Sequence, residues 1–349
     1  MRNILVVISV LSLFACAQEE DESNRAIEEK TLKARIQVYY LDTLHKTESG
    51  MYYMVQAKGK GEAIEKENFV YVHYSTLDLF ENHKWNTDSY TQTTQLMTSR
   101  EDVAKQLGDY SPTKYYGPDL WITGDYSLTE GVEEMMITMR EGDKRRIWLP
   151  SWLSSYGYVG SPPLYSSTTI HEVEILKVIT DIEQFQIDSL ESYRDKRYPG
   201  LDSLSYGFYI KTLKEGTGDT LKTGDKVNIW YVGRLLDDFV FDVNIADTAK
   251  RYNIFNSERS YEAFACECKE DGVLGQSGSE DSSDDGFVDG FSKAIFSMKH
   301  GEEAVAFFYS ELGYGAQRKP FQSFTPLVFW LKVEKTNFDE EEKKGGEET

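Results

Sequence analysis

Two short segments, one in each half of the chain, carry the same spacing of apolar residues. In each segment four apolar residues fall at positions i, i+3, i+4 and i+7, which places them on one face of a short helix. These residues are Phe291, Ala294, Ile295 and Met298 in the second half, and Val132, Met135, Met136 and Met139 in the first. A glycine stands before and after each stripe. Because so short a helix needs a sheet to bury its apolar face, the pattern predicts two similar domains, each with strands wrapped around one helix.

Strand-like runs precede each predicted helix at matching distances. Gly50 and Tyr74 are 24 residues apart (74 − 50 = 24), and Gly207 and Tyr231 are also 24 apart (231 − 207 = 24). Both stretches are typical of a strand, a glycine turn and a second strand, and further strand-like runs follow each helix. Strands before and after a single helix, without βαβ alternation, indicate the α+β class.

The other segments flank or connect these two domains. We expect the first domain over residues 45–178 and the second over 205–336, joined by a helical linker over 179–204. Residues 337–349 have the composition of a disordered acidic tail. Residues 17–44 combine an acidic tether with a helix, whose loose apolar stripe can either dock on the first domain or form a stalk.

Residues 1–16 have the features of an export signal. Arg2 precedes an apolar stretch over residues 4–14 that is too short to span a membrane as a helix. The residues up to Cys16 resemble a bacterial lipobox, in which the signal is cut before the cysteine and the cysteine is acylated; a plain secretory signal is the alternative. Acylation would anchor the protein to a membrane through Cys16, so we expect a lipid-anchored protein of the cell envelope, at the outer membrane.

The acidic run over residues 18–23 follows Cys16 directly. It resembles the run that follows the lipid cysteine in surface-exposed, Bacteroidetes-like lipoproteins. A flexible spacer without an address is the other interpretation of the same residues.

Composition excludes several function classes. The net charge of the 349-residue chain is −21, and the sequence has no basic patch, so nucleic acid is not an expected partner. Three cysteines rule out a disulfide framework, and the five histidines are scattered without the spacing of a metal or hydrolytic site. We therefore expect neither a metal nor a cofactor.

The stretch over residues 228–242, NIWYVGRLLDDFVFD, resembles a motif of the FKBP-type peptidyl-prolyl isomerases, V-x-Y-x-G-x-L-x-D-G-x-x-F-D. The glycine-led helix, the L-x-Y-G turn and the closing L-V-F strand are further motifs of that family. The resemblance covers residues 50–178 and 205–335. It implies two domains, each a bent antiparallel sheet of about five strands wrapped around one short helix.

The resemblance also implies a site for a proline-containing polypeptide in the second domain. It assigns a pocket floor, aromatic walls, a backbone N–H for a substrate carbonyl, a donor at the rim, and a carboxylate beside the reacting carbonyl that is held by a tyrosine hydroxyl. In this assignment, Phe291 is the floor, and Tyr231, Phe241 and Phe329 are the walls. Val288 supplies the backbone N–H, Tyr314 is the donor at the rim, and Asp242 is the carboxylate held by the Tyr231 hydroxyl. Spacing alone favours a different interpretation, in which the aromatic residues are core residues and Asp242 is a turn residue. The run after Tyr314 departs from the family pattern, and Phe321 or Phe324 could supply the missing apolar contact.

The first domain departs further from the family. Its candidate substrate-binding residues are Tyr74, Trp85, Val132, Tyr156 and His171. Trp85 stands near the position of the expected Phe-Asp pair, Val132 replaces the aromatic floor, and His171 replaces a wall phenylalanine. We expect a degenerate site that binds or spaces rather than catalyses.

Both domains contain a long insertion at the same place. It spans 47 positions in the first domain (132 − 85 = 47) and 50 in the second (291 − 241 = 50), and in the second it occupies residues 243–286. Residues 278–286 resemble the start of a calcium loop, but Ser292 replaces the closing Glu, so a mobile polar loop is the preferred interpretation. Cys266 and Cys268 could form a strained disulfide, a redox pair or two structural thiols.

Two functions of different classes follow. The first is a peptidyl-prolyl isomerase that assists the folding of exported proteins, with its activity in the second domain. The alternative is a non-catalytic scaffold or chaperone module, whose insertions bind a partner in a cell-envelope complex.

Overall fold

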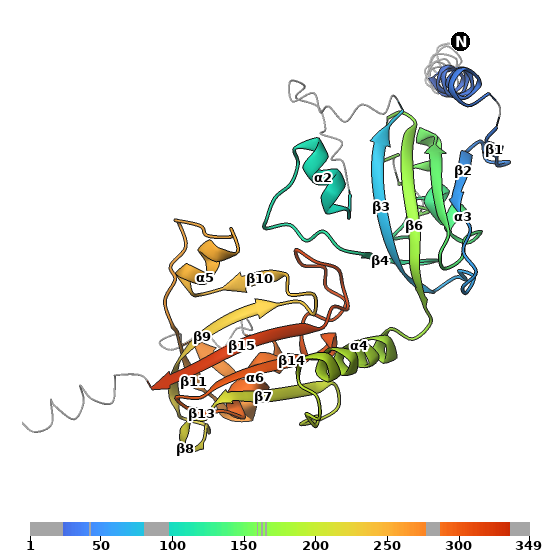
Figure 1. Ribbon diagram of the computed structural model, residues 1–349. Helices are drawn as coiled ribbons and strands as arrows, with labels where there is room; N and C mark the ends of the chain where they lie inside the picture. Colours follow the sequence, from blue (N-terminus) through green and yellow to red (C-terminus); the bar gives the residue numbers. More distant parts are fainter. Residues whose placement is uncertain are drawn as a thin grey trace, which may run out of the picture. The chain divides into compact units, whose positions relative to one another are not determined.

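The computed structural model describes residues 24–41, 43–79, 98–158, 160–161, 163–164, 166–276 and 287–335 (Figure 1). The chain forms two compact units. The first comprises Met1–Tyr110 and Tyr116–Thr180, and the second Asp181–Thr349 with the short stretch Ser111–Tyr115. Trp85 and Cys16 lie outside the described residues, as do the acidic run, the loop over residues 278–286 and the predicted tail.

The first unit is a six-stranded sheet in the order β1-β2-β5-β6-β3-β4, and every pairing is antiparallel. The strands are β1 (His45–Lys46), β2 (Tyr52–Ala57), β3 (Phe69–Asp78), β4 (Asp119–Ile122), β5 (Lys144–Leu149) and β6 (Thr169–Ile179). The helices are a segment over residues 24–40, α2 (Glu101–Leu107), α3 (Glu130–Met136) and the 3-10 turn η1 (Ser151–Leu153). One face of the sheet packs on α3 through a cluster that includes Val72, Met135 and Val173. The other packs on the helix over residues 24–40.

The second unit repeats this plan with a seven-stranded sheet, ordered β12-β11-β9-β15-β14-β7 with β10 paired to β9. Its strands are β7 (Phe208–Lys214), β9 (Lys226–Arg234), β10 (Val240–Val243), β11 (Phe264–Cys268), β12 (Leu274–Gln276), β14 (Glu303–Phe308) and β15 (Leu327–Lys335). A separate two-stranded ladder joins β8 (Thr217–Thr220) and β13 (Lys299–His300). The helices are α4 (Ile182–Arg197), α5 (Ala246–Arg251), η2 (Glu270–Gly272), α6 (Asp289–Phe296) and η3 (Ser310–Leu312).

Each sheet therefore lies between two helices. In the second unit α6 covers one face, and α4 covers the other through Leu190 and Tyr193, which pack on Phe307 and Val328. In the first unit Leu32 and Ile36 of the helix over residues 24–40 pack on Trp148 in the corresponding way. Burying both faces of the sheet removes more apolar area from water than a single helix could.

The outer helices are fastened by equivalent hydrogen bonds. The backbone N–H of Ser151, at the start of η1, donates to Glu28 Oε1 (2.8 Å), and the N–H of Ser310, at the start of η3, donates to Gln186 Oε1 (2.8 Å). The two pairs are offset by almost the same number of residues (310 − 151 = 159; 186 − 28 = 158). The internal repeat thus comprises an outer helix together with a sheet and its inner helix.

The glycine that leads each apolar stripe is explained by close packing. A Cβ on Gly290 would lie 2.5 Å from ring carbons of Phe308, and one on Gly131 would collide with Leu149 Cδ1. Only glycine lets the inner helix approach the sheet this closely. Both glycines are the second residue of their helix rather than the residue before it.

The α+β class with two antiparallel sheets is confirmed, and the sheets are larger than expected. The sheets have six and seven strands rather than about five, because β1 and β4 extend the first and β11 and β12 extend the second. The predicted linker helix, α4, is the outer layer of the second unit, and the helix over residues 24–40 docks on the first unit rather than forming a stalk. Among the described residues, no helix is both long and apolar enough to span a membrane.

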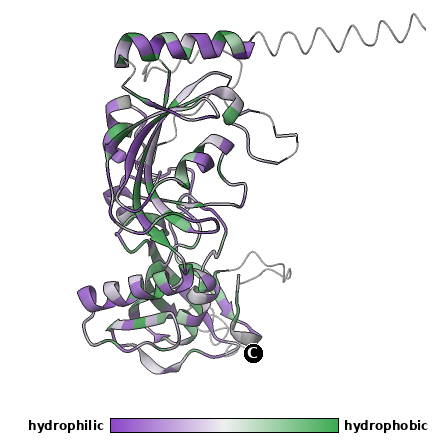
Figure 2. Ribbon diagram, turned by 90° about the vertical axis from the view of Figure 1, so that its right-hand side faces the viewer, coloured by the Kyte–Doolittle hydropathy of each residue, from purple (hydrophilic) through white to green (hydrophobic). Residues whose placement is uncertain are grey.

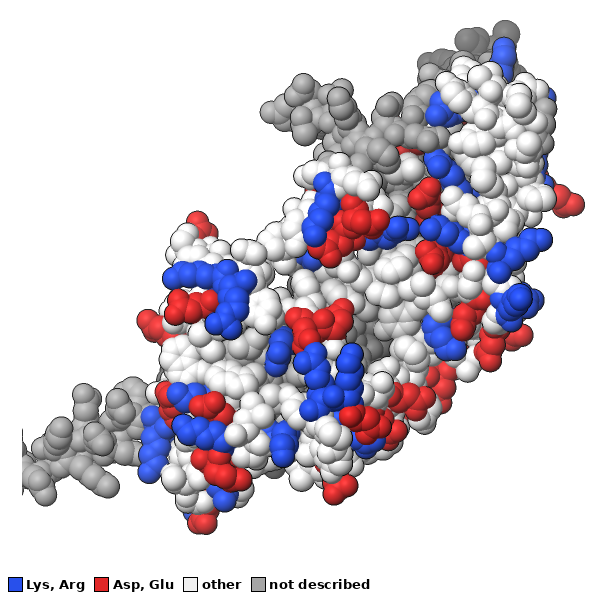
Figure 3. All heavy atoms as spheres, viewed as in Figure 1, with Lys and Arg blue, Asp and Glu red and all other residues white. Residues whose placement is uncertain are grey.

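Acidic and basic side chains are interspersed on the visible face of each unit. On the face shown in Figure 3, Lys and Arg alternate with Asp and Glu on both units. Several of these charges form ion pairs across neighbouring strands, as between Arg146 and Glu172 (3.4 Å).

Candidate active site

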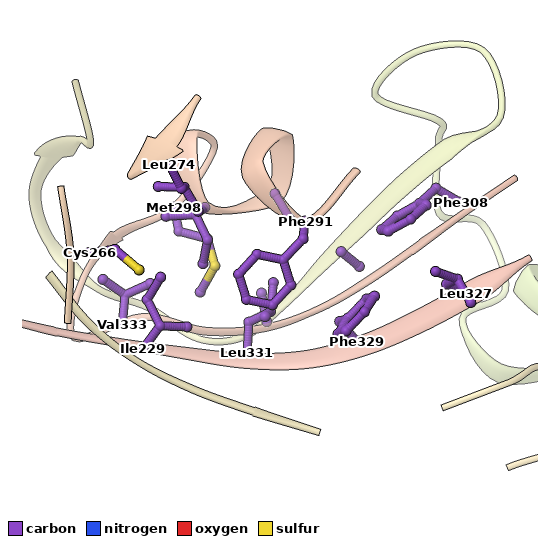
Figure 4. Packing of buried hydrophobic residues seen from close by; sticks show 14 of the residues in the cluster. Ile229, Cys266, Leu274, Phe291, Met298, Phe308, Leu327, Phe329, Leu331 and Val333 are labelled. Atoms are coloured by element: carbon purple, nitrogen blue, oxygen red, sulfur yellow. The ribbon is translucent and has the colours of Figure 1, made fainter. Parts of the chain in front are cut away.

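The second unit contains a cluster of aromatic side chains built around Phe291, the third residue of α6. Phe291 is 2% exposed and meets the ring of Phe329 edge to face, with a centroid distance of 5.2 Å. Tyr231 of β9 also meets Phe291 edge to face, at 5.7 Å. Figure 4 shows Phe291 pointing from α6 onto β15, beside Phe329 and Leu331. Three of the residues predicted for the site therefore form one contiguous aromatic cluster.

A β-bulge brings Phe241 and Asp242 into this cluster. The pairing of β10 with β9 shifts register between Val240 and Asp242, so Phe241 is the extra residue. A bulge of this kind bends the strand and redirects its side chains. The Phe241 ring lies 5.8 Å from that of Phe329, edge to face.

Gly233, opposite the bulge, makes room for the two rings. A Cβ at this position would lie 2.7 Å from Phe241 Cζ and 3.0 Å from Phe329 Cε1. The glycine of the Tyr-Val-Gly motif is thus required by the packing of two aromatic residues of the site.

Asp242 is held by side chains from two segments. The Tyr231 hydroxyl donates to Asp242 Oδ2 (2.8 Å), and Arg259 Nη1 donates to Asp242 Oδ1 (2.6 Å). Arg259 Nη2 also donates to the Tyr231 oxygen (3.3 Å), which closes a three-membered network. Burial, together with the neighbouring Asp242 carboxylate, raises the pKa of Tyr231 far above its ordinary value, so its hydroxyl remains a donor at every physiological pH.

Asn244 connects the site to the insertion that carries Arg259. Its side-chain oxygen accepts from the Tyr231 N–H (2.7 Å), and its amide donates to the carbonyls of Ile229 (2.8 Å) and Glu262 (3.1 Å). Asn244 is 4% exposed. A buried amide with this many hydrogen bonds fixes the backbone near Tyr231 and positions the segment that contains Arg259.

The partly exposed residues of the cluster form its rim. Val288 is the N-cap residue of α6, and its carbonyl accepts from the N–H groups of Phe291 (2.9 Å) and Ser292 (3.2 Å). The Phe287 ring stacks on Phe291 at 4.7 Å. Tyr314 and Phe241 both contact Phe321, with centroid distances of 6.1 and 5.0 Å.

Phe321 thus supplies the apolar contact that the sequence left open between two phenylalanines. It is buried among the rings of the cluster. Burial raises the pKa of the neighbouring Tyr314, and the charge of Asp242 adds to the effect. Tyr314 therefore also stays a protonated donor at neutral pH.

Three residues of this arrangement were missed by sequence reasoning. Arg259 lies 17 positions after Asp242 (259 − 242 = 17), in an irregular stretch without periodicity. Asn244 and Phe287 adjoin recognised motifs, but nothing in their spacing distinguishes them from turn or core residues. A carboxylate expected beside a tyrosine hydroxyl was the available signal that a cation should be nearby.

The first unit has a different set of groups at the equivalent positions. Tyr74 and Val132 belong to one hydrophobic cluster, and the Tyr74 ring lies 5.1 Å from Trp121. Tyr156 forms an isolated backbone bridge with Thr129, the N-cap residue of α3, and its ring stacks with Tyr158.

His171 pairs with Thr76 across β6 and β3, as Phe329 pairs with Gly233 in the second unit. Its ring nitrogens lie 2.9 Å from Thr169 Oγ1 and 3.5 Å from Thr76 Oγ1. Complete burial lowers the pKa of His171 to about 4, so the ring is neutral. A hydrogen-bonded imidazole thus replaces an aromatic wall.

The two cysteines of the insertion are buried thiols on one face of β11. Cys266 and Cys268 are both free and lie in the hydrophobic core of the second unit. Burial raises the pKa of Cys266 to about 12 and that of Cys268 to about 11. Such thiols are structural rather than reactive. Within the described ranges, no group of His, Cys, Asp and Glu side chains could hold a metal ion.

The geometry of the second unit agrees with a match to a known family. Residues 218–334 match the family model described as FKBP-type peptidyl-prolyl cis-trans isomerase. This part of the chain is an FKBP-type peptidyl-prolyl isomerase domain, and the protein therefore carries an isomerase domain. No curated protein matches the chain.

Several solved structures resemble the chain, including those of the following three proteins. The structure of the three FKBP domains of wheat FKBP73 is 15% identical and covers 84% of this chain and 98% of its own, with a TM-score of 0.28. A peptidyl-prolyl isomerase from Pseudomonas syringae pv. tomato is 22% identical and covers 43% and 92%, with a TM-score of 0.30. FkpA from Escherichia coli is 20% identical and covers 50% and 71%, with a TM-score of 0.29.

Proposed function

We propose that the second unit catalyses cis-trans isomerisation of X-Pro peptide bonds in exported polypeptides and so assists their folding. The barrier to this rotation, about 18–20 kcal/mol, arises from loss of amide resonance and requires no nucleophile, metal or proton donor. A catalyst needs only to bind the twisted amide better than the planar one. A water-poor surface of aromatic rings disfavours the more polar planar amide and can hold the proline ring while the chain turns.

The observation that carries the proposal is the position of Asp242 among the aromatic rings. Its carboxylate is held by Tyr231 and Arg259 beside an aromatic cluster whose centre is Phe291. In this proposal Phe241, Phe291 and Phe329 contact the proline ring, and Asp242 lies beside the reacting carbonyl. Val288 receives a substrate carbonyl through its N–H, and Tyr314 donates from the rim.

A protease-coupled assay on an Ala-Leu-Pro-Phe peptide tests the proposal with the full chain. We expect Phe241→Ala to lower kcat/KM about 100-fold, because it removes one wall of the aromatic surface, and Tyr231→Phe to lower it about 10-fold. Tyr206→Phe is the matched control, since the exposed Tyr206 hydroxyl donates to Glu183 at 2.8 Å, the length of the Tyr231–Asp242 bond. Wild-type activity in Phe241→Ala would contradict the assignment.

The first unit is proposed to bind or space rather than catalyse. The neutral His171 ring, paired with two threonines, stands where the second unit has a phenylalanine wall. If both units were active, the combined Tyr231→Phe and Phe241→Ala variant would retain a substantial rate. A rate indistinguishable from the uncatalysed reaction is expected.

A purely scaffolding role is the competing function, and the same variants separate the two. A scaffold would accelerate no peptide isomerisation and would co-purify with envelope proteins even when Phe241 is replaced.

The location that we propose is the cell envelope, with an acyl anchor on Cys16. The apolar stretch over residues 4–14 and the lipobox-like residues before the cysteine support it. Metabolic labelling with a radioactive fatty acid is expected to mark the protein and to fail for Cys16→Ser. Labelling that persists in this variant would refute the anchor.

A further inference from the structure

The helix over residues 24–40 has an apolar stripe on the face turned away from the sheet. Leu41, which directly follows the helix in the left-handed region (φ 46°), is 79% exposed. Within the helix, Ile27 and Val38 are 63% and 70% exposed, and with the exposed Ala34 they fall at i, i+7 and i+11. That spacing aligns them along one side of the helix. Four of the five most exposed large hydrophobic side chains of the described chain belong to this helix or directly follow it: Leu41, Val38, Tyr39 and Ile27. Figure 2 shows hydrophobic and hydrophilic residues together along it.

The equivalent helix of the second unit lacks such a stripe. Helix α4 is fastened to its sheet in the same way, but all its exposed residues are polar. They are Glu183, Gln184, Asp188, Glu191, Ser192, Asp195, Lys196 and Arg197. A fold that requires only the buried face of its outer helix leaves the outward face free to vary. The apolar outward face of the first helix is therefore not a requirement of the fold.

The charges of the first helix are divided between its two faces. The Glu28 carboxylate accepts hydrogen bonds from the Ser151 and Thr168 hydroxyls of the first unit. Glu29 Oε1 lies 3.9 Å from Lys46 Nζ. The exposed Lys30 and Lys33 flank one side of the stripe, and Arg35 flanks the other. Residues 24–41 hold four basic and two acidic residues, a net charge of +2 (4 − 2 = 2), in a chain whose net charge is −21.

We propose that this outward face lies on a membrane surface that contains anionic phospholipids. An apolar stripe between Lys and Arg side chains is the pattern of a helix in the plane of the membrane, with its cations among the headgroups. The acidic run over residues 18–23 lies directly before the helix and reduces this attraction, whereas acidic charges further than about 8 Å from the surface are screened at physiological ionic strength.

The basic side chains beside the stripe favour a membrane, rather than a second copy of the chain, as the partner of this face. Two such helices pairing along their stripes would bring Lys30 and Lys33 opposite like charges, which destabilises the pair. The cations suit the phosphates of a lipid surface instead.

The position of the helix in the chain also favours contact with a membrane. This argument rests on the proposed acylation of Cys16. Asn24, the first described residue of the helix, is eight residues from Cys16 (24 − 16 = 8). An extended chain of that length reaches about 28 Å at most. An anchor at Cys16 would therefore hold the helix within reach of the bilayer, and the contact would orient the first unit upon it.

Vesicle co-sedimentation of the non-acylated chain from residue 17 onward tests the contact without the anchor. We expect binding to vesicles of equal phosphatidylglycerol and phosphatidylcholine, reduced at least fivefold on pure phosphatidylcholine or in 0.5 M salt. The double variant Val38→Asp, Leu41→Asp is expected to lose at least fivefold. The control, Leu204→Asp with Val273→Asp, changes the charge equally at side chains 54% and 52% exposed in the second unit, and is expected to bind normally.

Equal binding by both double variants, or no preference for anionic vesicles, would overturn the proposal. So would a dimer in light scattering that Val38→Asp, Leu41→Asp dissociates, because the stripe would then be covered by a second copy. Loss of fatty-acid labelling at Cys16 leaves this assay unaffected, so the anchor and the helix contact can fail separately.

Discussion

Replacing Arg259 with alanine removes two of the contacts that hold the Tyr231–Asp242 pair. Asp242 would keep its bond from Tyr231 (2.8 Å) and the one from the Val243 N–H (2.8 Å), so its position loosens without being lost. Hydrogen bonds to charged groups contribute about 1.5–3 kcal/mol when buried. The side chains of Arg259 and Asp242 are 41% and 36% exposed, so about 1 kcal/mol is the appropriate figure.

One kcal/mol corresponds to a fall in kcat/KM of about fivefold. We expect this loss for Arg259→Ala in the peptide assay, and partial recovery for Arg259→Lys, which keeps the charge without the planar pair of donors. Thermal unfolding should change by no more than about 4 °C, since an exposed ion pair contributes little to stability.

Arg251→Ala is the matched control, because it removes an exposed arginine at the end of α5 in the same insertion. The reasoning would be refuted if Arg259→Ala kept full activity while Asp242→Asn lost it. A uniform loss of activity with unfolding would equally exclude a positioning role.

Three further predictions concern packing and titration. Gly290→Ala should destabilise the second unit by about 1–2 kcal/mol in urea unfolding, because the clash with Phe308 outweighs a gain of about 1 kcal/mol in helix propensity; an unchanged midpoint would contradict the packing. Because burial lowers the pKa of His171 to about 4, its contribution to the stability of the first unit is complete above about pH 6.5 and is lost as the pH falls toward 4. Between pH 6.5 and 5 the loss is about 2 kcal/mol, visible as faster hydrogen exchange in β6 and absent in His171→Phe. Cys266 and Cys268 should react with a thiol reagent at pH 8 only after unfolding, and rapid reaction of the native protein would disprove their burial.

Periodicity was sufficient to predict the parts of the fold that depend on burial. The apolar stripes at Phe291 and Val132 predicted both inner helices, because an i, i+3, i+4, i+7 pattern has few other uses in a chain of this composition. The same reasoning predicted α4 but not its role, since a stripe that includes Leu190 does not indicate which sheet face it covers.

The sequence likewise predicted some residues of the candidate site but not others. Tyr231, Phe241, Asp242 and Phe291 stand at fixed spacings in strands and a helix, so motifs place them. Arg259 reaches Asp242 only through the path of an irregular insertion, which no local pattern encodes.

The matching hydrogen bonds at Ser151 and Ser310 show that each unit includes its outer helix, so fragments of the protein should keep that helix. A fragment that begins at residue 205 would lack α4 and would expose Phe307 and Val328 to solvent. Such an exposed apolar surface is prone to aggregation. Fragments intended for crystallisation or NMR should begin at Asn24 or Asp181, so that each retains its own cover.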